Sequence, residues 1–203
     1  MEKRTVAPRT APPTSPPATS EPAGTAPTSD GATTTSAPPR PTGEDVALLG
    51  FAQSLELAAR DLYQAALDGG LADGELADLF TTLRDNHDEY ANRLSGILGV
   101  DAPQQRDDAL FDELADGFGG GDAVAVATAG MDLEAMAVAT HNDLLGRLQG
   151  IDGIAAVASF VVVEARHGTV LADVAGDGDD LDTLLTSDAQ PLDAPAPAGW
   201  RTS

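Results

Sequence analysis

The chain has 203 residues, which is enough for one domain with tails. Its 33 acidic residues outnumber its 11 basic residues and give a formal net charge of −22, which argues against nucleic acid or an anionic membrane as a partner, because both bind basic surfaces. The chain has no cysteine, which excludes disulfides, thiolate metal sites and cysteine nucleophiles. No apolar run reaches the length of a transmembrane segment.

Residues 1–43 differ in composition from the rest of the chain. They hold ten of the fourteen prolines, with many Thr, Ala and Ser and almost no large apolar residue, so we expect a disordered tail. The segment lacks the apolar core of a signal peptide. A Pro/Thr/Ser-rich stalk would suit an extracytoplasmic protein whose export signal lies upstream of this sequence; otherwise the protein is cytoplasmic, and the localisation stays open.

The next part of the chain has helical periodicity. Apolar residues recur at spacings of three and four from Glu44 until Gly69-Gly70 interrupts them, which predicts a first helix. A second helix is expected from a cap at Asp73 to Gly99, and because the link between the two is short they should be antiparallel neighbours. Residues 100–121 are irregular apart from a short amphipathic piece, about 108–116.

Two more long helices follow. The pattern predicts a third helix over about 122–148, a tight turn at 150–153 and a fourth helix to about Ala175, where Gly176 ends it. One or two helical turns are expected from Leu181, and residues 187–203 form a flexible C-terminal tail. The short, long, short connections predict an all-α fold at residues 44–186: an antiparallel four-helix bundle of two helical hairpins with one longer crossover.

Polar residues interrupt the apolar stripes of these helices. Glu164 and His167 are three apart and share the apolar face of the fourth helix, where a charged group is costly unless it has a partner. A metal ion is one such partner, because Glu-x-x-His offers two ligands at one point. The alternative is a buried hydrogen bond between the two side chains.

The two predicted hairpins repeat the same polar pattern. In each, a Glu is followed seven residues later by a polar side chain on the same helix, and a pair three apart follows on the next helix. The first hairpin supplies Glu56, Tyr63, His87 and Tyr90, and the second supplies Glu134, His141, Glu164 and His167. We therefore expect all four helices to direct polar groups into one core at similar depth.

With these residues, the core resembles the ferritin-like superfamily, in particular the small bacterial ferritin-like domains that do not form cages. The family pattern is Glu, Glu-x-x-His, Glu and Glu-x-x-His on successive helices. The resemblance implies a metal site formed by Glu56, His87, Glu134, Glu164 and His167, with Tyr63, Tyr90 and His141 around it as hydrogen-bond partners. The second helix departs from the pattern, because His87 stands in the Glu position and Tyr90 in the His position.

The resulting functional prediction is a ferritin-like protein that binds a divalent metal. Three carboxylates, two imidazoles and a phenol suit one ion of Fe, Mn or Zn, or two held weakly, and no organic cofactor is expected. An oxidase-type activity is implied by the resemblance alone. The alternative is a ferritin-like module that has lost its metal and serves a structural or interaction role. An unrelated helical enzyme has no support, because the chain shows no phosphate-binding loop and no nucleophile elbow; a homodimer stays open.

Overall fold

The computed structural model describes residues 41, 43–70, 74–119 and 122–195. These residues form helices and no strand, so the prediction of an all-α fold is confirmed. The predicted N-terminal tail lies outside the described residues, apart from Pro41 and Gly43, and Trp200 lies outside them too. The helices are α1 (Glu44–Asp68), α2 (Glu75–Leu98), the 3-10 helix η1 (Gly99–Asp101), α3 (Asp108–Phe118), α4 (Ala123–Leu145), α5 (Ile151–Ala175) and α6 (Leu181–Leu185).

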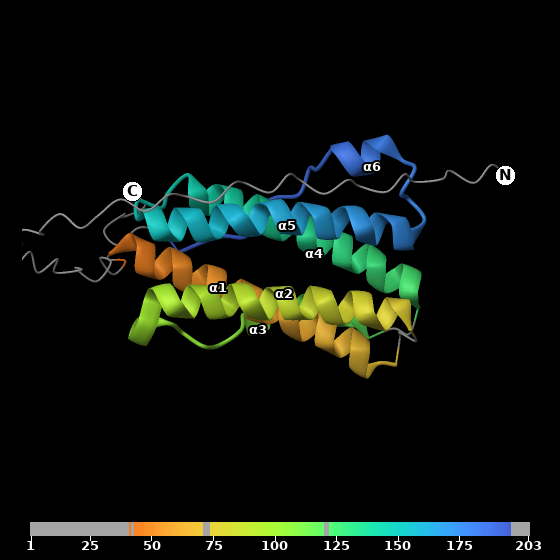
Figure 1. Ribbon diagram of the computed structural model, residues 1–203, viewed down its shortest axis with the longest axis horizontal. Coiled ribbons are helices and arrows are strands. Elements are labelled where there is room, and N and C mark those ends of the chain that lie inside the picture. Colours follow the sequence, from red (N-terminus) through yellow and green to blue (C-terminus); the bar gives the residue numbers. More distant parts are fainter. Residues whose placement is uncertain (1–40, 42, 71–73, 120–121, 196–203) are drawn as a thin grey trace, which may run out of the picture. The chain divides into compact units, whose positions relative to one another are not determined.

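The four long helices are arranged in two pairs. Helix α1 packs mainly against α2, and α4 packs mainly against α5. The connection between the pairs contains η1 and α3, and α3 contacts both α1 and α4. Figure 1 shows the two pairs side by side, with α6 outside α5. The chain thus brings one face of each long helix into a common interior.

Most helix ends follow from local sequence. Asp107 and Asp122 cap α3 and α4 by accepting hydrogen bonds from the backbone N–H groups of Leu110 and Val124, at 3.1 Å and 3.0 Å. Gly176 ends α5 in the left-handed conformation, with φ of 95°. At the start of α2 the N-cap is Gly74 rather than the predicted Asp73, which lies outside the described residues.

Beside a smaller cluster of Leu55, Ala58, Leu110 and Ala137, the apolar core has two layers, one toward each end of the bundle. The first joins the start of α1, the end of α2, the end of α4 and the start of α5, through Leu48, Leu49, Leu94, Leu98, Leu144, Val157 and Phe160. The second joins the opposite halves of the same helices, through Leu62, Tyr63, Phe80, Leu83, Val126, Leu133 and Leu171. The helices therefore bury apolar side chains on both sides of their midpoints. The predicted glutamates and histidines lie between the two layers, whereas Tyr63 and Tyr90 belong to the layers themselves.

Helices α4 and α5 are long and apolar enough, by length and composition, to cross a membrane. From the sequence, no apolar run of transmembrane length is expected. This length and apolar composition are only weak evidence for a membrane protein, because the core helices of globular proteins have them too. Each helix also buries a glutamate and a histidine on its inward face: Glu134 and His141 on α4, and Glu164 and His167 on α5.

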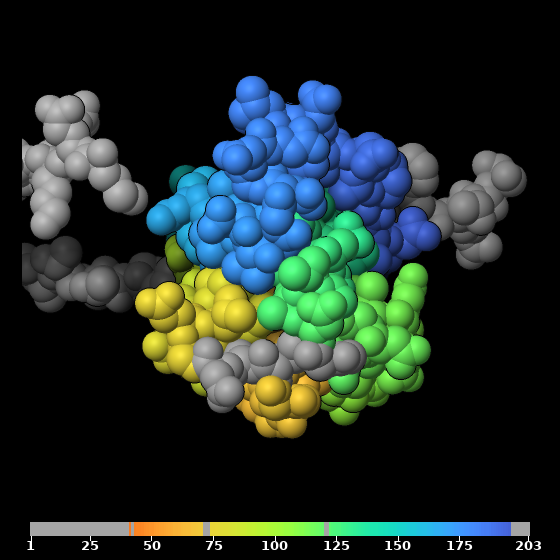
Figure 2. Space-filling model, turned by 90° about the vertical axis from the view of Figure 1, so that its right-hand side faces the viewer, coloured from red at the N-terminus to blue at the C-terminus, as the bar shows by residue number. Residues whose placement is uncertain are grey.

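The segment that follows α6 contacts the bundle. The backbone N–H of Leu192 donates a hydrogen bond to Thr140 Oγ1 on α4 at 3.0 Å, and the Leu192 side chain packs against a cluster that includes Leu110 and Ala137. In the end-on view of Figure 2, the blue residues that follow α5 project from the surface next to the green helix α4. Part of the predicted C-terminal tail thus lies along α4.

Candidate metal centre

Six buried side chains form two groups at the middle of the bundle. In each group, three side chains offer ligand atoms that all lie within 4.8 Å of one another. One group is His87, Glu134 and His167, and the other is Glu56, His141 and Glu164. All six residues are at most 7% exposed.

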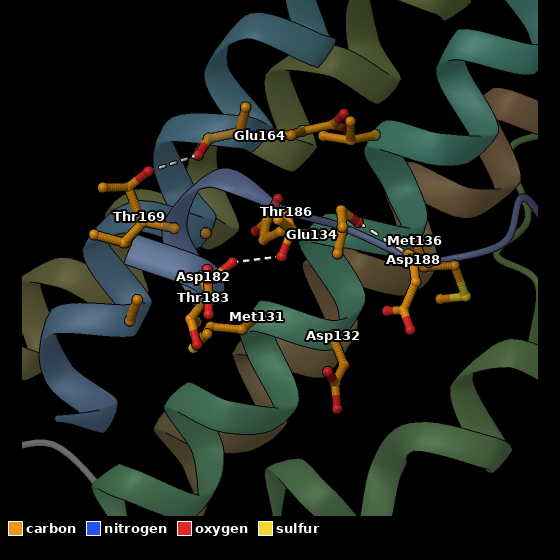
Figure 3. A pocket seen from close by; sticks show the side chains of 18 of the residues that line it. Met131, Asp132, Glu134, Met136, Glu164, Thr169, Asp182, Thr183, Thr186 and Asp188 are labelled. Atoms are coloured by element: carbon orange, nitrogen blue, oxygen red, sulfur yellow. Dashed lines mark hydrogen bonds between the residues drawn. The ribbon is translucent and has the colours of Figure 1, made fainter. Parts of the chain in front are cut away.

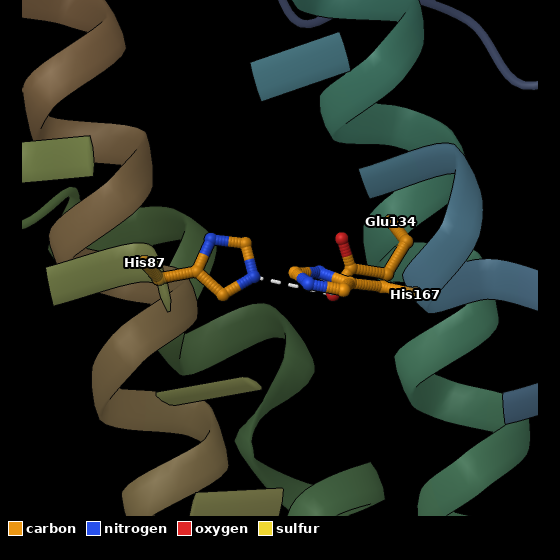
Figure 4. A group of neighbouring side chains, drawn as sticks. All are labelled: His87, Glu134 and His167. Carbon is orange, nitrogen blue, oxygen red and sulfur yellow. Dashed lines mark hydrogen bonds and ion pairs between the residues drawn. The ribbon is translucent and has the colours of Figure 1, made fainter. Parts of the chain in front are cut away.

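The first group spans three helices. Figure 4 shows His87 reaching from α2 toward Glu134 of α4 and His167 of α5. His87 Nε2 lies 3.2 Å from Glu134 Oε1, and His167 Nδ1 lies 3.3 Å from the same oxygen. The other ring nitrogen of His167 is 2.9 Å from the side-chain amide of Asn86. Glu134 Oε1 is therefore the atom on which both imidazoles of this group converge.

The second group also spans three helices. His141 of α4 lies between two carboxylates, with Nδ1 3.0 Å from Glu164 Oε2 on α5 and Nε2 3.1 Å from Glu56 Oε1 on α1. Glu56 also joins the two groups, because its Oε2 lies 2.7 Å from His87 Nδ1. The six side chains thus form one connected network.

The repeat seen in the sequence has a counterpart in these contacts. Tyr63, seven residues after Glu56, donates a hydrogen bond of 2.7 Å to Glu134 in the other helix pair. His141, seven residues after Glu134, lies 3.1 Å from Glu56 in the first pair. Each pair of helices therefore sends a side chain from the +7 position to the other pair's glutamate, as a pseudo-twofold arrangement requires.

Five polar atoms of the centre have no hydrogen-bond partner although they are fully buried. They are Glu56 Oε1, Glu134 Oε2, His141 Nε2, Glu164 Oε1 and His167 Nδ1. Two of them, Glu56 Oε1 and His141 Nε2, are only 3.1 Å apart, but the angle between them does not suit a hydrogen bond. A buried polar atom without a partner is costly. Ligand atoms that converge in this way without pairing suit a shared cation.

In the metal-free network, the buried carboxylates and imidazoles shift one another's pKa values. Burial alone would lower the pKa of His141, but the adjacent carboxylates of Glu164 and Glu56 outweigh burial and raise it to about 10. Burial likewise opposes the charge of Glu134, yet His87 and His167 hold the pKa of Glu134 at about 2. Glu164 differs, because burial and the nearby carboxylates outweigh His141 and raise its pKa.

His87 follows His141 in this respect. Both of its ring nitrogens face carboxylates, and although burial opposes its charge, Glu134 and Glu56 raise its pKa well above the usual value. A neutral imidazole has one N–H, whereas an imidazolium can donate to both carboxylates. Without metal, the network therefore holds its charge balance with protons on His87 and His141.

The five side chains predicted as metal ligands all lie in the two groups. His141, predicted as a surrounding hydrogen-bond partner, is also a member of one group. Its place on the apolar stripe seven residues after Glu134 was the available signal. Tyr90, also predicted as a surrounding partner, packs its ring on Phe160 with centroids 4.4 Å apart and lies edge-on to His87. Asn86, which contacts His167, carried no signal in the sequence.

Comparison with known proteins identifies the family. The model of the ferritin-like domain family matches residues 44–177, which include all the long helices and the whole centre. No curated protein and no solved structure matches the chain. The match covers more than half of the sequence and the buried glutamates and histidines lie within it, so the chain belongs to the ferritin-like domain family.

Proposed function

We propose that this chain folds as the antiparallel four-helix bundle of ferritin-like domains and binds one or two divalent metal ions at the centre of the bundle. The ligands would be the two groups described above, so His141 joins the five residues that the sequence predicts. The observation that carries the proposal is the set of five buried oxygen and nitrogen atoms without hydrogen-bond partners, all of them in these two groups.

The donor atoms favour a transition metal. Two imidazoles and one carboxylate form the first group, and two carboxylates and one imidazole form the second. Mixed nitrogen and oxygen ligands suit Fe, Mn or Zn, whereas Ca²⁺ and Mg²⁺ prefer oxygen alone. The three negative charges of the carboxylates exceed the charge of one divalent ion. They fall short of the charge of two divalent ions, which would leave the centre with a net positive charge. This balance supports one firmly bound ion, with a second held more weakly.

Side chains around the groups would orient the ligands. Tyr63 donates to Glu134 Oε1, and Asn86 contacts the outer nitrogen of His167, so each fixes the direction of a ligand. An iron ion, when bound, would supply the redox chemistry with dioxygen that the family resemblance implies. Binding requires His87 and His141 to give up protons, because a metal and a proton compete for the same ring nitrogen.

A second function rests on the same contacts. Protonated His87 and His141 each lie between two carboxylates, and these ion pairs stabilise the bundle without metal. A metal-free structural or interaction module would use them in this way. It leaves Glu134 Oε2 and Glu164 Oε1 with neither a hydrogen bond nor an ion pair among the described residues, which is why we prefer the metal-binding function.

Elemental analysis of the purified protein and thermal melts with Fe(II), Mn(II) or Zn(II) separate the two functions. A metal at about one hundred times its dissociation constant stabilises the folded state by about 2.7 kcal/mol, which corresponds to a rise in Tm of roughly 5–10 °C for a domain of this size. Glu164→Ala and His167→Ala should abolish the rise. The matched control is Glu89→Ala, because Glu89 is exposed on α2. A Tm indifferent to all three metals, in a protein that contains none, would favour the metal-free module.

A further inference from the structure

A cavity of about 720 Å³ lies beside the centre, between α4, α5 and the residues from α6 onward. Figure 3 shows the side chains that line it, with Glu134 and Glu164 among those of α4 and α5 and with Asp182, Thr183, Thr186 and Asp188 on the opposite wall. The cavity therefore extends from a surface segment to residues of both groups of the centre.

The two glutamates that line the cavity have free ligand atoms. Glu134 Oε2 and Glu164 Oε1 have no hydrogen-bond partner, and both residues are at most 1% exposed. Their other oxygens face the histidines of the centre. One unpartnered carboxylate oxygen from each group thus belongs to a side chain on the wall of the same cavity.

The charge of the lining has one sign. Five carboxylates line the cavity, and the described residues of the lining include no Lys, Arg or His. Two of the five are the glutamates of the centre, and the other three, Asp132, Asp182 and Asp188, are exposed. A cavity with acidic walls raises the local concentration of cations and repels anions.

Several residues of α4 and α5 on the cavity wall are small. Ala135, Ala165, Gly168 and Ala172 all line the cavity. A Cβ atom at Gly168 would meet the Cβ of Glu134 at 3.9 Å, an ordinary contact, so the glycine is not required by close helix packing. Between this glycine and Glu134 there is thus room for about one methyl group.

We propose that this cavity is the entrance through which hydrated divalent cations reach the metal centre. The inference rests on the metal-binding function proposed above. Asp132, Asp182 and Asp188 attract the hydrated ion at the mouth, and polar side chains such as Thr183 and Gln190 replace part of its water. Glu134 and Glu164 then take the ion with their unpartnered oxygens, and the histidines complete its ligation.

Loading kinetics with Co(II) test the entrance. The d–d absorbance of Co(II), followed in a stopped-flow instrument with the full chain after treatment with a chelator, reports arrival at nitrogen and oxygen ligands. The triple variant Asp132→Asn, Asp182→Asn, Asp188→Asn should load at least about tenfold more slowly at low ionic strength, and the difference should shrink in about 0.5 M salt because salt screens exposed charges. The final stoichiometry should equal that of the wild type.

The matched control removes three carboxylates that do not line the cavity. Asp112, Glu113 and Asp116 are exposed on α3, so Asp112→Asn, Glu113→Gln, Asp116→Asn changes the net charge by the same amount. It should load at nearly the wild-type rate. A second variant, Thr169→Trp, places bulk at an exposed lining position of α5 without changing charge. Its loading should be slowed to the same extent at every salt concentration.

The outcomes separate this inference from the function on which it rests. A wild-type protein that gives no d–d band with Co(II) overturns both. If the wild-type protein binds Co(II), and the Asp132/Asp182/Asp188 triple variant and Thr169→Trp both load at the wild-type rate, the proposed entrance is overturned but the metal-binding function is not. If the Asp112/Glu113/Asp116 control variant loads as slowly as the Asp132/Asp182/Asp188 variant, the entrance is also overturned, because the effect would then come from net charge and not from the cavity.

Discussion

His87 is, with Tyr90, one of the two residues that depart from the Glu and His pattern implied by the family resemblance. It lies between Glu56 and Glu134, at 2.7 Å and 3.2 Å, where a fourth carboxylate would stand in the family pattern. An imidazole at this point reduces the negative charge available to metal, but when protonated it neutralises the metal-free centre. Under the proposed function, an imidazole here would therefore shift the balance of stability from the metal-bound toward the metal-free state.

Restoring the family pattern should reverse this balance. We expect His87→Glu combined with Tyr90→His to tighten binding of Fe(II) or Mn(II) by about tenfold or more, which is about 1.4 kcal/mol. The metal-free variant should be less stable than the wild type, because four carboxylates then face one another with fewer cationic partners. Calorimetric titration and melts in the presence of a chelator measure the two effects. Weaker metal binding in the variant would show that His87 is the better ligand.

The protons on the histidines predict how the stability of the metal-free protein depends on pH. His141 has a folded-state pKa of about 10 against 6.5 when unfolded, so its contribution is fully present below pH 6.5 and is lost as the pH rises toward 10. The pKa of His87 is raised in the same sense. Glu134 has a pKa of about 2, so its contribution is present above pH 4.5 and is lost on acidification toward 2.

Chemical denaturation with a chelator present should therefore show highest stability between about pH 4.5 and 6.5 and a decline toward pH 9. Metal binding has the opposite trend, because ligands must lose protons, and the rise in Tm with metal should be larger at pH 8 than at pH 5. Stability of the metal-free protein that increases from pH 6 to pH 9 would mean that the histidines are neutral in the folded state.

Among the helices, α1 holds the turn that leads into α5 through the side chain of Asp45 at one end of the bundle. Asp45, in the first turn of α1, is 6% exposed and accepts hydrogen bonds from the backbone N–H groups of Gln149 and Gly150, at 3.0 Å and 2.7 Å. These are donors of the turn that leads into α5, so the carboxylate satisfies groups that the helix itself leaves unpaired. One residue of the first helix pair thus anchors the turn of the second.

Asp45→Ala should destabilise the protein by about 1–3 kcal/mol, because it leaves two amide donors without their acceptor. The control Asp112→Ala removes an exposed acid from α3 and should change the free energy of unfolding by less than about 0.5 kcal/mol. Urea titrations of both variants measure the difference. Equal small effects would mean that water replaces the carboxylate at the turn.

The sequence predicted the helices well, but it did not predict the contacts that hold one helix or segment against another. Helical periodicity and glycines at helix ends placed the four long helices, and Glu and His on apolar stripes pointed to the centre, because burial of a charged side chain is rare enough to be noticed. The ties between elements were not predictable. Asp45 reads as an ordinary acid in a first helical turn, and the wall made by residues 182–190 depends on where a segment of weak helical signal packs.

For the molecule as a whole, the dominant property is a formal net charge of −22. Such an excess of one sign opposes the compact state, because like charges are closer together when the chain is folded. Raising NaCl from about 10 mM to about 0.5 M should therefore raise Tm in the presence of a chelator, and KCl should act equally well because the effect is screening. A Tm that stays constant or falls would show that attractive ion pairs outweigh the repulsion.

The grouping of α1 with α2 and of α4 with α5 also bears on cooperativity. Contacts are concentrated within each pair, so each pair has the character of a separate cooperative unit, and the interface between the pairs is the natural place for partial opening. Both groups of the centre take one residue from the first pair and two from the second. Native-state hydrogen exchange should then show two units that open independently without metal. With metal bound, the same amides should exchange only through global unfolding.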